Sequence, residues 1–251
     1  MEQLLFPSAE AATSPLDVLI FLDTETTGTE IGTDRLCQVC FLQKGEIRTE
    51  FFKPPLPIPI KAMSVHHITN KMVADKPTFI GSEFERDLQE RLDHGILVAH
   101  NARFDIGMLE TEGVRVGRHI CTYRVAFYLD RDSKIPEYNL QYLRYYLDLE
   151  IDAVAHDAEG DVRVLYALFE WLLVEMRKEI PDTAAAIEQM VQISSQPMLF
   201  RKFNFGKYKD QALADVARSD RGYLEWLLAQ KQKSGEGEND WIYTLQHYLQ
   251  R

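Results

Sequence analysis

The sequence is poor in cysteine and contains no long hydrophobic run, and each of these absences excludes a class of protein. Three cysteines among 251 residues are too few for a disulfide scaffold, and reduced thiols fit a cytoplasmic protein. No apolar run approaches the ~18 residues that a membrane span needs, so we expect no membrane span. The first 14 residues lack a basic start, so no secretion signal is expected either.

Basic residues are the minority charge, with 28 lysines and arginines against 39 acidic residues and a net charge of −11. The balance is uneven, because residues 1–197 carry 19 basic and 32 acidic side chains, whereas residues 198–251 carry nine and seven. The change coincides with the break at Ser194–Pro197. We therefore expect a main domain over 1–180, a helical linker over 181–197 and a small C-terminal domain over 198–251.

Cys37 and Cys40 have the C-x-x-C spacing that metal and redox sites use. They lie in the strand-like run 35–42, in which residues three apart face opposite ways. We therefore interpret both as cysteines packed within a strand.

Carboxylates gather in three short segments that lie far apart in the sequence. In the first segment, Asp23 and Glu25 follow the apolar run Val18–Leu22, which is typical of a strand buried on both faces. Alternation along a strand places these two side chains on one side and Thr24 on the other. Two like charges there repel, and a bound cation is the simplest way to keep both ionised.

The second segment, His100–Asp105, follows Ile96–Ala99, another candidate for a buried strand. Asp105 is expected in the first turn of a helix that runs to about Glu112 and ends before Gly113. A carboxylate is well tolerated at the start of a helix.

The third segment, His156–Asp161, precedes a long amphipathic stretch from about Ala158 to Glu179. Asp157 is expected to cap this helix, and Asp161 to face inward from its first turn.

Each segment alone is typical of ordinary strand ends, corners and loops, but the three together supply four carboxylates and one histidine. Hydrolysis of a phosphodiester by two divalent cations needs negative charge held around the ions and a base for the attacking water. An imidazole with an unperturbed pKa near ~6.5 is suited to that proton transfer. The pattern therefore indicates a two-metal nuclease site.

Over about residues 15–180 the sequence also resembles the DEDDh, or DnaQ-like, 3′–5′ exonucleases, a family related to the proofreading subunit of DNA polymerase III and to exonuclease X. The segments Phe21–Gly28, His100–Asp105 and His156–Asp161 match its three motifs in order. The sister DEDDy group has a tyrosine where this chain has Asp157, so the histidine branch is favoured. The resemblance implies that two Mg²⁺ or Mn²⁺ ions are bound by four acids, with His156 as general base. These acids are Asp23, Glu25, Asp105 and Asp161.

The resemblance also implies residues that hold the substrate. Thr26 would lie beside the terminal sugar, and Phe104 and Val65 against the last base, with Glu25 helping to hold the 3′-terminal nucleotide. His66 matches a histidine that contacts substrate, while His67 replaces a glycine of the family pattern. If that glycine serves a positive-φ turn, histidine tolerates the strain better than a branched residue would. The alternative is that His66 and His67 are polar loop residues.

Beyond residue 197 the chain resembles the C-terminal domain of exonuclease X-like proteins. The likeness lies in Phe205–Lys209 and Tyr223–Leu228, and Asp210 replaces the glycine of that pattern. Aromatic and basic residues alternate from Arg201 to Lys209, as in surfaces that bind single strands. We favour instead that Phe203 and Phe205 face the small domain's own core, and the roles of Lys207 and Lys209 stay open.

We expect a mixed α/β sheet of the ribonuclease H-like exonuclease type, flanked by helices, with a small C-terminal domain. Strands near 17–24, 35–43 and 46–53 would form an antiparallel meander, with a strand near 96–100 beside the first. The expected activity is metal-dependent release of nucleoside 5′-monophosphates from DNA 3′ ends, single strands favoured, in proofreading or DNA repair. Trimming of RNA ends and a weakly active binding module are the alternatives, and a polymerase or repair partner is open.

Overall fold

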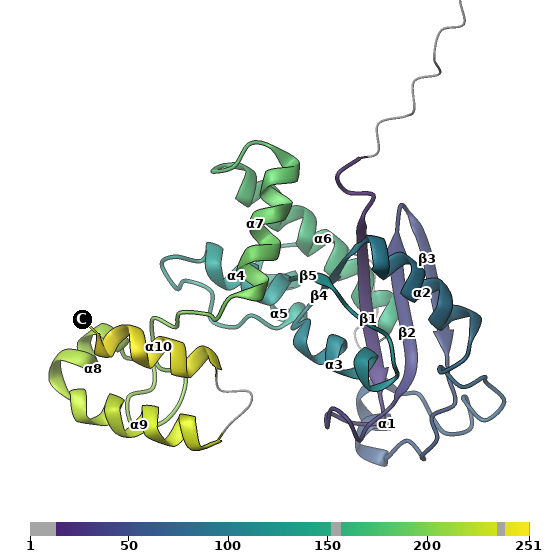
Figure 1. The fold of residues 1–251 in the computed structure, drawn as a ribbon, viewed down its shortest axis with the longest axis horizontal. Coiled ribbons are helices and arrows are strands. Elements are labelled where there is room, and N and C mark those ends of the chain that lie inside the picture. Colours follow the sequence, from purple (N-terminus) through teal and green to yellow (C-terminus); the bar gives the residue numbers. More distant parts are fainter. Residues whose placement is uncertain (1–13, 152–156, 235–238, 251) are drawn as a thin grey trace, which may run out of the picture.

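The computed structural model describes residues 14–151, 157–234 and 239–250 (Figure 1). Its centre is a five-stranded sheet in the order β3-β2-β1-β4-β5. The first three strands are antiparallel, and β4 and β5 run parallel to β1. The expected mixed sheet is therefore confirmed. Its strands are β1 (Leu19–Thr26), β2 (Leu36–Gln43), β3 (Glu46–Phe51), β4 (Ile96–Ala99) and β5 (Arg118–Cys121).

Helices cover both faces of the sheet because β1 is apolar on both sides. Leu19 and Phe21 belong to the core under the long helix α6, whereas Ile20 and Leu22 belong to the core under α2 and α3. In the larger unit the helices are α1 (Ile60–His66), α2 (Glu83–His94), α3 (Arg103–Thr111), α4 (Thr122–Leu129), α5 (Leu140–Tyr146), α6 (Ala158–Arg177) and α7 (Thr183–Ser195).

The two strand cysteines lie on opposite faces, as their spacing predicts. Cys37 packs with Ile58 and Ile68, whereas Cys40 belongs to the core under α6. Both are buried free thiols, so this interpretation is confirmed. Within the described residues, no helix is both long and apolar enough to cross a membrane.

The segment expected as a linker, residues 181–197, is helical but is not a free connection. Ala186, Ile187 and Met190 of α7 are buried in the main core, and the helix packs against β5. The hydroxyl of Ser194 also accepts a hydrogen bond from the Cys121 backbone N–H at 2.8 Å. Helix α7 is therefore part of the larger unit.

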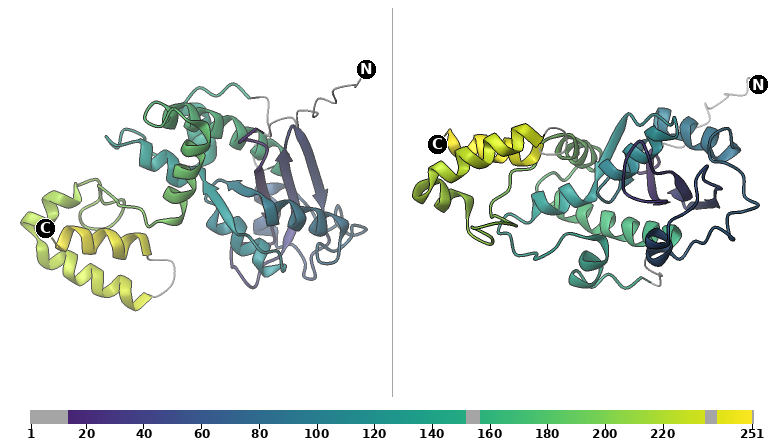
Figure 2. Two further views of the ribbon diagram at one scale, coloured as in Figure 1. Left: turned by 45° about the horizontal axis from the view of Figure 1, so that its top comes forward. Right: turned by 90° about the horizontal axis from the view of Figure 1, so that it is seen from below.

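The C-terminal residues form a separate helical group, shown in yellow-green to yellow in Figures 1 and 2. It contains α8 (Leu213–Ser219), α9 (Arg221–Ser234) and α10 (Asn239–Leu249). Phe203 is buried among Leu213, Leu224 and Trp241, and the Phe205 ring lies 4.9 Å from that of Trp241. The favoured interpretation of these phenylalanines is therefore confirmed.

Polar and aromatic contacts hold this small unit against α4. Arg124 donates to both carboxylate oxygens of Asp240, at 3.1 and 2.8 Å. The Phe127 and Phe200 rings lie edge to face at 5.7 Å. Arg201 lies over Phe127 and donates to the Asp130 carbonyl at 3.1 Å.

Candidate active site

Three carboxylates from two distant elements meet at the end of β1. One oxygen each from Asp23, Glu25 and Asp161 lies within 4.8 Å of the others. Alternation along β1 directs the first two to one side, and Asp161 is buried in the first turn of α6. Packing of α6 on β1 sets the separation, since the Phe21 and Phe169 rings are 5.1 Å apart.

Asp105 lies beside this cluster but is not one of the three residues that share the 4.8 Å separation. It is buried in the first turn of α3, which follows β4. Its Oδ1 accepts a hydrogen bond from the Thr24 hydroxyl at 2.8 Å. The parallel pairing of β4 with β1 brings this fourth predicted acid to the site.

Three of the four acids, Asp23, Glu25 and Asp105, have raised pKa values, chiefly because each is buried. Burial, followed by the charges of Asp161 and Asp105, raises the pKa of Glu25 to about 8. Burial and the same two neighbours raise the pKa of Asp23 well above its usual value. Burial raises the pKa of Asp105 to about 7, against the Thr24 hydrogen bond that lowers it. Carboxylate oxygens are the ligands that hard divalent cations prefer, so this donor set fits such ions.

Two glutamine side chains hold the start of α6, and neither was predicted from the sequence. Gln141 Nε2 donates to Asp161 Oδ1 at 2.6 Å. Gln38 Nε2 donates to Asp157 Oδ1 at 3.3 Å, and its Oε1 accepts from the Ala158 N–H at 3.4 Å. Asp157 occupies the N-cap position, as expected, but its side chain makes no capping hydrogen bond. Its carboxylate accepts the hydrogen bond from Gln38 instead of one from a backbone N–H of α6.

The predicted base, His156, lies outside the described residues, so its role stays a prediction. The other histidine of these segments is not a base candidate. His100 Nε2 donates to the Tyr138 carbonyl at 2.7 Å, and its Nδ1 accepts from the Thr122 hydroxyl at 2.9 Å. Burial lowers the pKa of His100 to about 4, so the ring is neutral, and its two hydrogen bonds join the end of β4 to Thr122 and Tyr138.

The residues predicted to hold the substrate line one pocket beside the acids, with a volume of about 420 Å³. Thr26, Val65, His66 and Phe104 all contribute to its wall, together with Glu25. Sequence reasoning missed other lining residues, among them the exposed Lys61. Val65 is 48% exposed, which leaves its side chain accessible to a ligand.

His66 is fixed in one neutral form within this pocket. Its Nδ1 accepts from the Ile68 N–H at 3.0 Å, so Nε2 carries the proton and donates to the Thr26 carbonyl at 3.2 Å. Burial lowers its pKa. The next residue, His67, adopts φ 62° at the end of α1, which is the left-handed turn expected where the family pattern has glycine.

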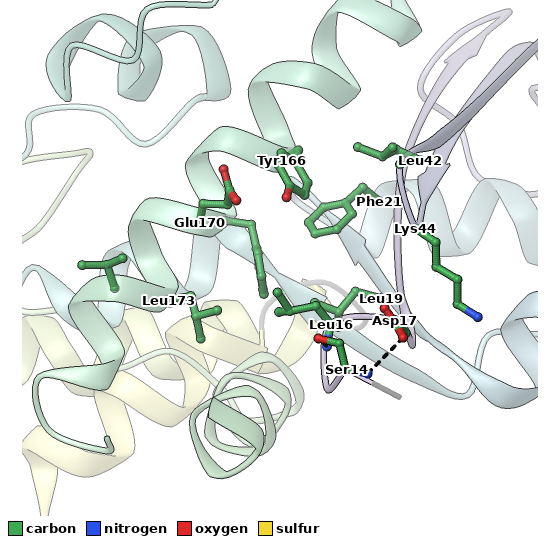
Figure 3. A pocket seen from close by; sticks show the side chains of 13 residues that line it. Ser14, Leu16, Asp17, Leu19, Phe21, Leu42, Lys44, Tyr166, Glu170 and Leu173 are labelled. Carbon is green, nitrogen blue, oxygen red and sulfur yellow. Dashed lines mark hydrogen bonds between the residues drawn. The ribbon is translucent and has the colours of Figure 1, made fainter. Parts of the chain in front are cut away.

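A second pocket of about 360 Å³ lies at the opposite end of β1 (Figure 3). Leu16, Leu19 and Leu173 line it, with Tyr166 and Glu170 from α6. None of the four predicted acids, all of which lie among the described residues, lines it.

An acid cluster at the end of the central strand, with helices on both faces of a mixed sheet, defines a nuclease of ribonuclease H-like fold. The family described as Exonuclease matches residues 20–169, and the Exodeoxyribonuclease X-like C-terminal family matches residues 203–232. The chain therefore belongs to the exonuclease family and is a 3′–5′ exonuclease, a phosphodiester hydrolase. The resemblance inferred from the three motifs is confirmed.

Known relatives are similar over different lengths. Exodeoxyribonuclease 10 of Escherichia coli (strain K12) is 32% identical over 245 residues, covering 93% of this chain and 99% of that protein. The DNA polymerase III subunit epsilon of Treponema pallidum (strain Nichols) is 32% identical over 168 residues, covering 62% of this chain and 77% of the subunit.

Among solved structures, exonuclease X in complex with 5′ overhanging duplex DNA matches with a TM-score of 0.54 and 28% identity, covering 70% of this chain and 99% of that one. E. coli exonuclease I in complex with a dT13 oligonucleotide matches with a TM-score of 0.55 and 18% identity, covering 65% of this chain and 42% of that one. The second likeness concerns the fold alone.

Proposed function

We propose that the chain removes nucleoside 5′-monophosphates from the 3′ ends of DNA, with two Mg²⁺ or Mn²⁺ ions held by Asp23, Glu25, Asp105 and Asp161. The observation that carries this proposal is the approach of three buried or half-buried carboxylates to within 4.8 Å, with Asp105 beside them. Such a concentration of negative charge is unfavourable unless cations neutralise it.

The residues of the site have three roles in the proposed reaction: binding cations, holding the terminal nucleotide and accepting a proton. The cations, when bound, neutralise the scissile phosphate and make the attacking water more acidic. Thr26, Val65, His66 and Phe104 hold the 3′-terminal nucleotide in the pocket beside the acids. His156 takes the proton from the attacking water, a transfer typically worth ~10²–10⁴ in rate.

DNA is proposed as the substrate because relatives are named for it. The name exodeoxyribonuclease 10 and the complex of exonuclease X with 5′ overhanging duplex DNA support DNA over RNA. The same site chemistry can cut RNA, which is the rival. A role in repair or proofreading, with a polymerase as a partner, is supported by the epsilon-subunit relatives. Buried free thiols support a cytoplasmic location.

The division into parts is also a proposal. Residues 1–180 would form the exonuclease domain, 181–197 a helical connection docked on it, and 198–251 the small C-terminal domain. The separate apolar core around Phe203 and Trp241 supports the last of these.

Cleavage of matched DNA and RNA oligonucleotides, labelled in the 3′-terminal nucleotide, tests the activity. We expect Mn²⁺-dependent release of mononucleotides from DNA, and loss of cleavage in Asp23→Asn and Asp161→Asn. The control is Asp17→Asn, since Asp17 precedes β1 at its other end. Folded Asp23→Asn with substantial metal-dependent cleavage would contradict the site, and faster cleavage of RNA would contradict the substrate.

A further inference from the structure

The side chain of Gln141 bridges Asp161 and Arg144 at the edge of the acid cluster. Its Nε2 donates to Asp161 Oδ1 at 2.6 Å, and its Oε1 accepts from an Arg144 guanidinium N–H at 3.3 Å. We infer that Gln141 is a positioning residue, which sets the orientation of the Asp161 carboxylate for binding of a divalent cation. This inference rests on the proposed function, because it assumes that Asp161 is a ligand.

The chemistry of the two partners determines which way the amide points. The Arg144 guanidinium can only donate, so it faces the amide oxygen. An ionised Asp161 can only accept, so it faces the amide N–H₂. The reversed amide would place two acceptors together at one end and two donors at the other. Gln141 is therefore held in the orientation that donates to the carboxylate.

Helix α5 presents Gln141 from a fixed backbone. Asn139 caps the helix, because its Oδ1 accepts from the Tyr142 N–H at 2.8 Å. One turn further on, Leu143 is fully buried in the core that α6 also lines. The glutamine and the aspartate therefore belong to two helices packed against each other, and the bond between them spans only side chains.

A neutral amide suits this task better than a charged donor would. It fills one position on the Asp161 carboxylate and restrains its rotation, yet it leaves the full negative charge for a cation. Without it, repulsion from Asp23 and Glu25 would favour rotation of the carboxylate away from the cluster. Residues that orient metal ligands in this way are typically worth ~10–100-fold in metal affinity.

The test compares Gln141→Leu and Gln141→Met, two apolar replacements of similar size. Mn²⁺ binding to the full chain is measured by titration calorimetry, and the melting temperature is measured in EDTA. We expect Mn²⁺ affinity to fall about 10–100-fold, with melting temperatures in EDTA close to that of the parent. Cleavage should need more Mn²⁺ but approach the parent rate at saturation. Tyr142→Phe on the same helix is the control and should bind Mn²⁺ normally.

Unchanged Mn²⁺ affinity in either folded variant would overturn the inference. A parallel loss of melting temperature and affinity in both variants would overturn it in favour of a structural role. Asp161→Asn separates this question from the proposed function. If that variant binds Mn²⁺ like the parent, the ligand assignment itself fails, whereas normal binding in the Gln141 variants alone removes only the positioning role.

Discussion

At the scale of single residues, protons and divalent cations compete for the carboxylate oxygens of the site. Asp23, Glu25 and Asp105 all have raised pKa values, chiefly because each is buried. A bound cation would lower these pKa values, because its positive charge stabilises the ionised carboxylates. Binding of metal at neutral pH is therefore expected to release protons.

Metal-free stability should fall as the pH rises. The folded, metal-free state keeps protons on these groups that the unfolded chain releases above about pH 4, so their stabilisation is complete below that pH. It is lost as the pH rises through the folded pKa values, about 7 for Asp105 and about 8 for Glu25. The lowered pKa of His100 makes the folded state more stable as the pH rises, but this effect is confined to the range below the free histidine pKa of about 6.5.

Melting temperatures in EDTA between about pH 6.5 and about pH 9 test this expectation. Each such group lowers the free energy of unfolding by up to about 1.4 kcal/mol per pH unit, which corresponds to about 3–6 °C in melting temperature for a protein of this size. Asp23→Asn should show a weaker decline, and Mn²⁺ should stabilise the parent more at the upper end of the range. A melting temperature in EDTA that does not change with pH would contradict the shifted carboxyl groups.

At the scale of elements, the site depends on how α6 begins. Helix α6 packs on β1, and its first residues are tied to β2 by Gln38, which is 2% exposed. The residue that precedes this anchored start is His156. The side-chain amide of Gln38 thus connects the sheet to the segment that carries the proposed base.

Replacing Gln38 by leucine, a side chain of similar size, removes the hydrogen bonds to Asp157 and to the Ala158 N–H. We expect a loss of about 1–3 kcal/mol of unfolding free energy, measured in urea, and a lower cleavage rate at saturating Mn²⁺. Gln43→Leu is the matched control. It is also a buried glutamine of β2, bonded to the Asp17 carbonyl and to Arg91 at the other end of the strand. Equal loss of activity in the two variants would show that stability alone is responsible.

At the scale of the whole molecule, the larger unit and the C-terminal unit are joined through the 196–201 segment and the Arg124–Asp240 pair. The side chains of that pair are only 19% and 20% exposed, so the docking contact is half-buried. The basic residues of the C-terminal unit are partly engaged, because Lys207 pairs with Asp220 at 3.2 Å. Arg201 is also occupied by Asp130 and Phe127, which leaves fewer cations for a nucleic acid than the sequence implies.

A chain that ends at Gln196 should fold and keep its metal-dependent cleavage of short oligonucleotides. It retains all of α7, including Ser194, and all five predicted catalytic residues. If the C-terminal unit binds strands, the shortened chain should bind long single strands more weakly and with a shallower salt dependence. Equal affinity and salt slope would reject that role.

The full chain with Asp240→Asn is the companion variant, because it weakens docking without removing the unit. If only the shortened chain loses affinity, the unit itself contacts the strand. Failure of the shortened chain to fold would show that residues beyond 196 complete the main core.

The sequence by itself determined the features that follow from local periodicity. The alternation of β1 put Asp23 and Glu25 on one side, and the same rule separated Cys37 from Cys40. The resemblance also grouped Thr26, Val65, His66 and Phe104, which line one pocket. These outcomes need only the strand repeat or matched motifs, so they could be predicted from one chain.

Only the tertiary structure decided which distant side chains orient the site. Gln38 meets Asp157 across 119 residues, and Gln141 meets Asp161 from a short helix that had not been predicted. The strand β5 and the docking of α7 also depend on long-range packing. Local propensity carries no information about such partners, because the hydrogen bonds form only after the sheet and helices have packed. For that reason the acids were found in the sequence, whereas the residues that hold them were not.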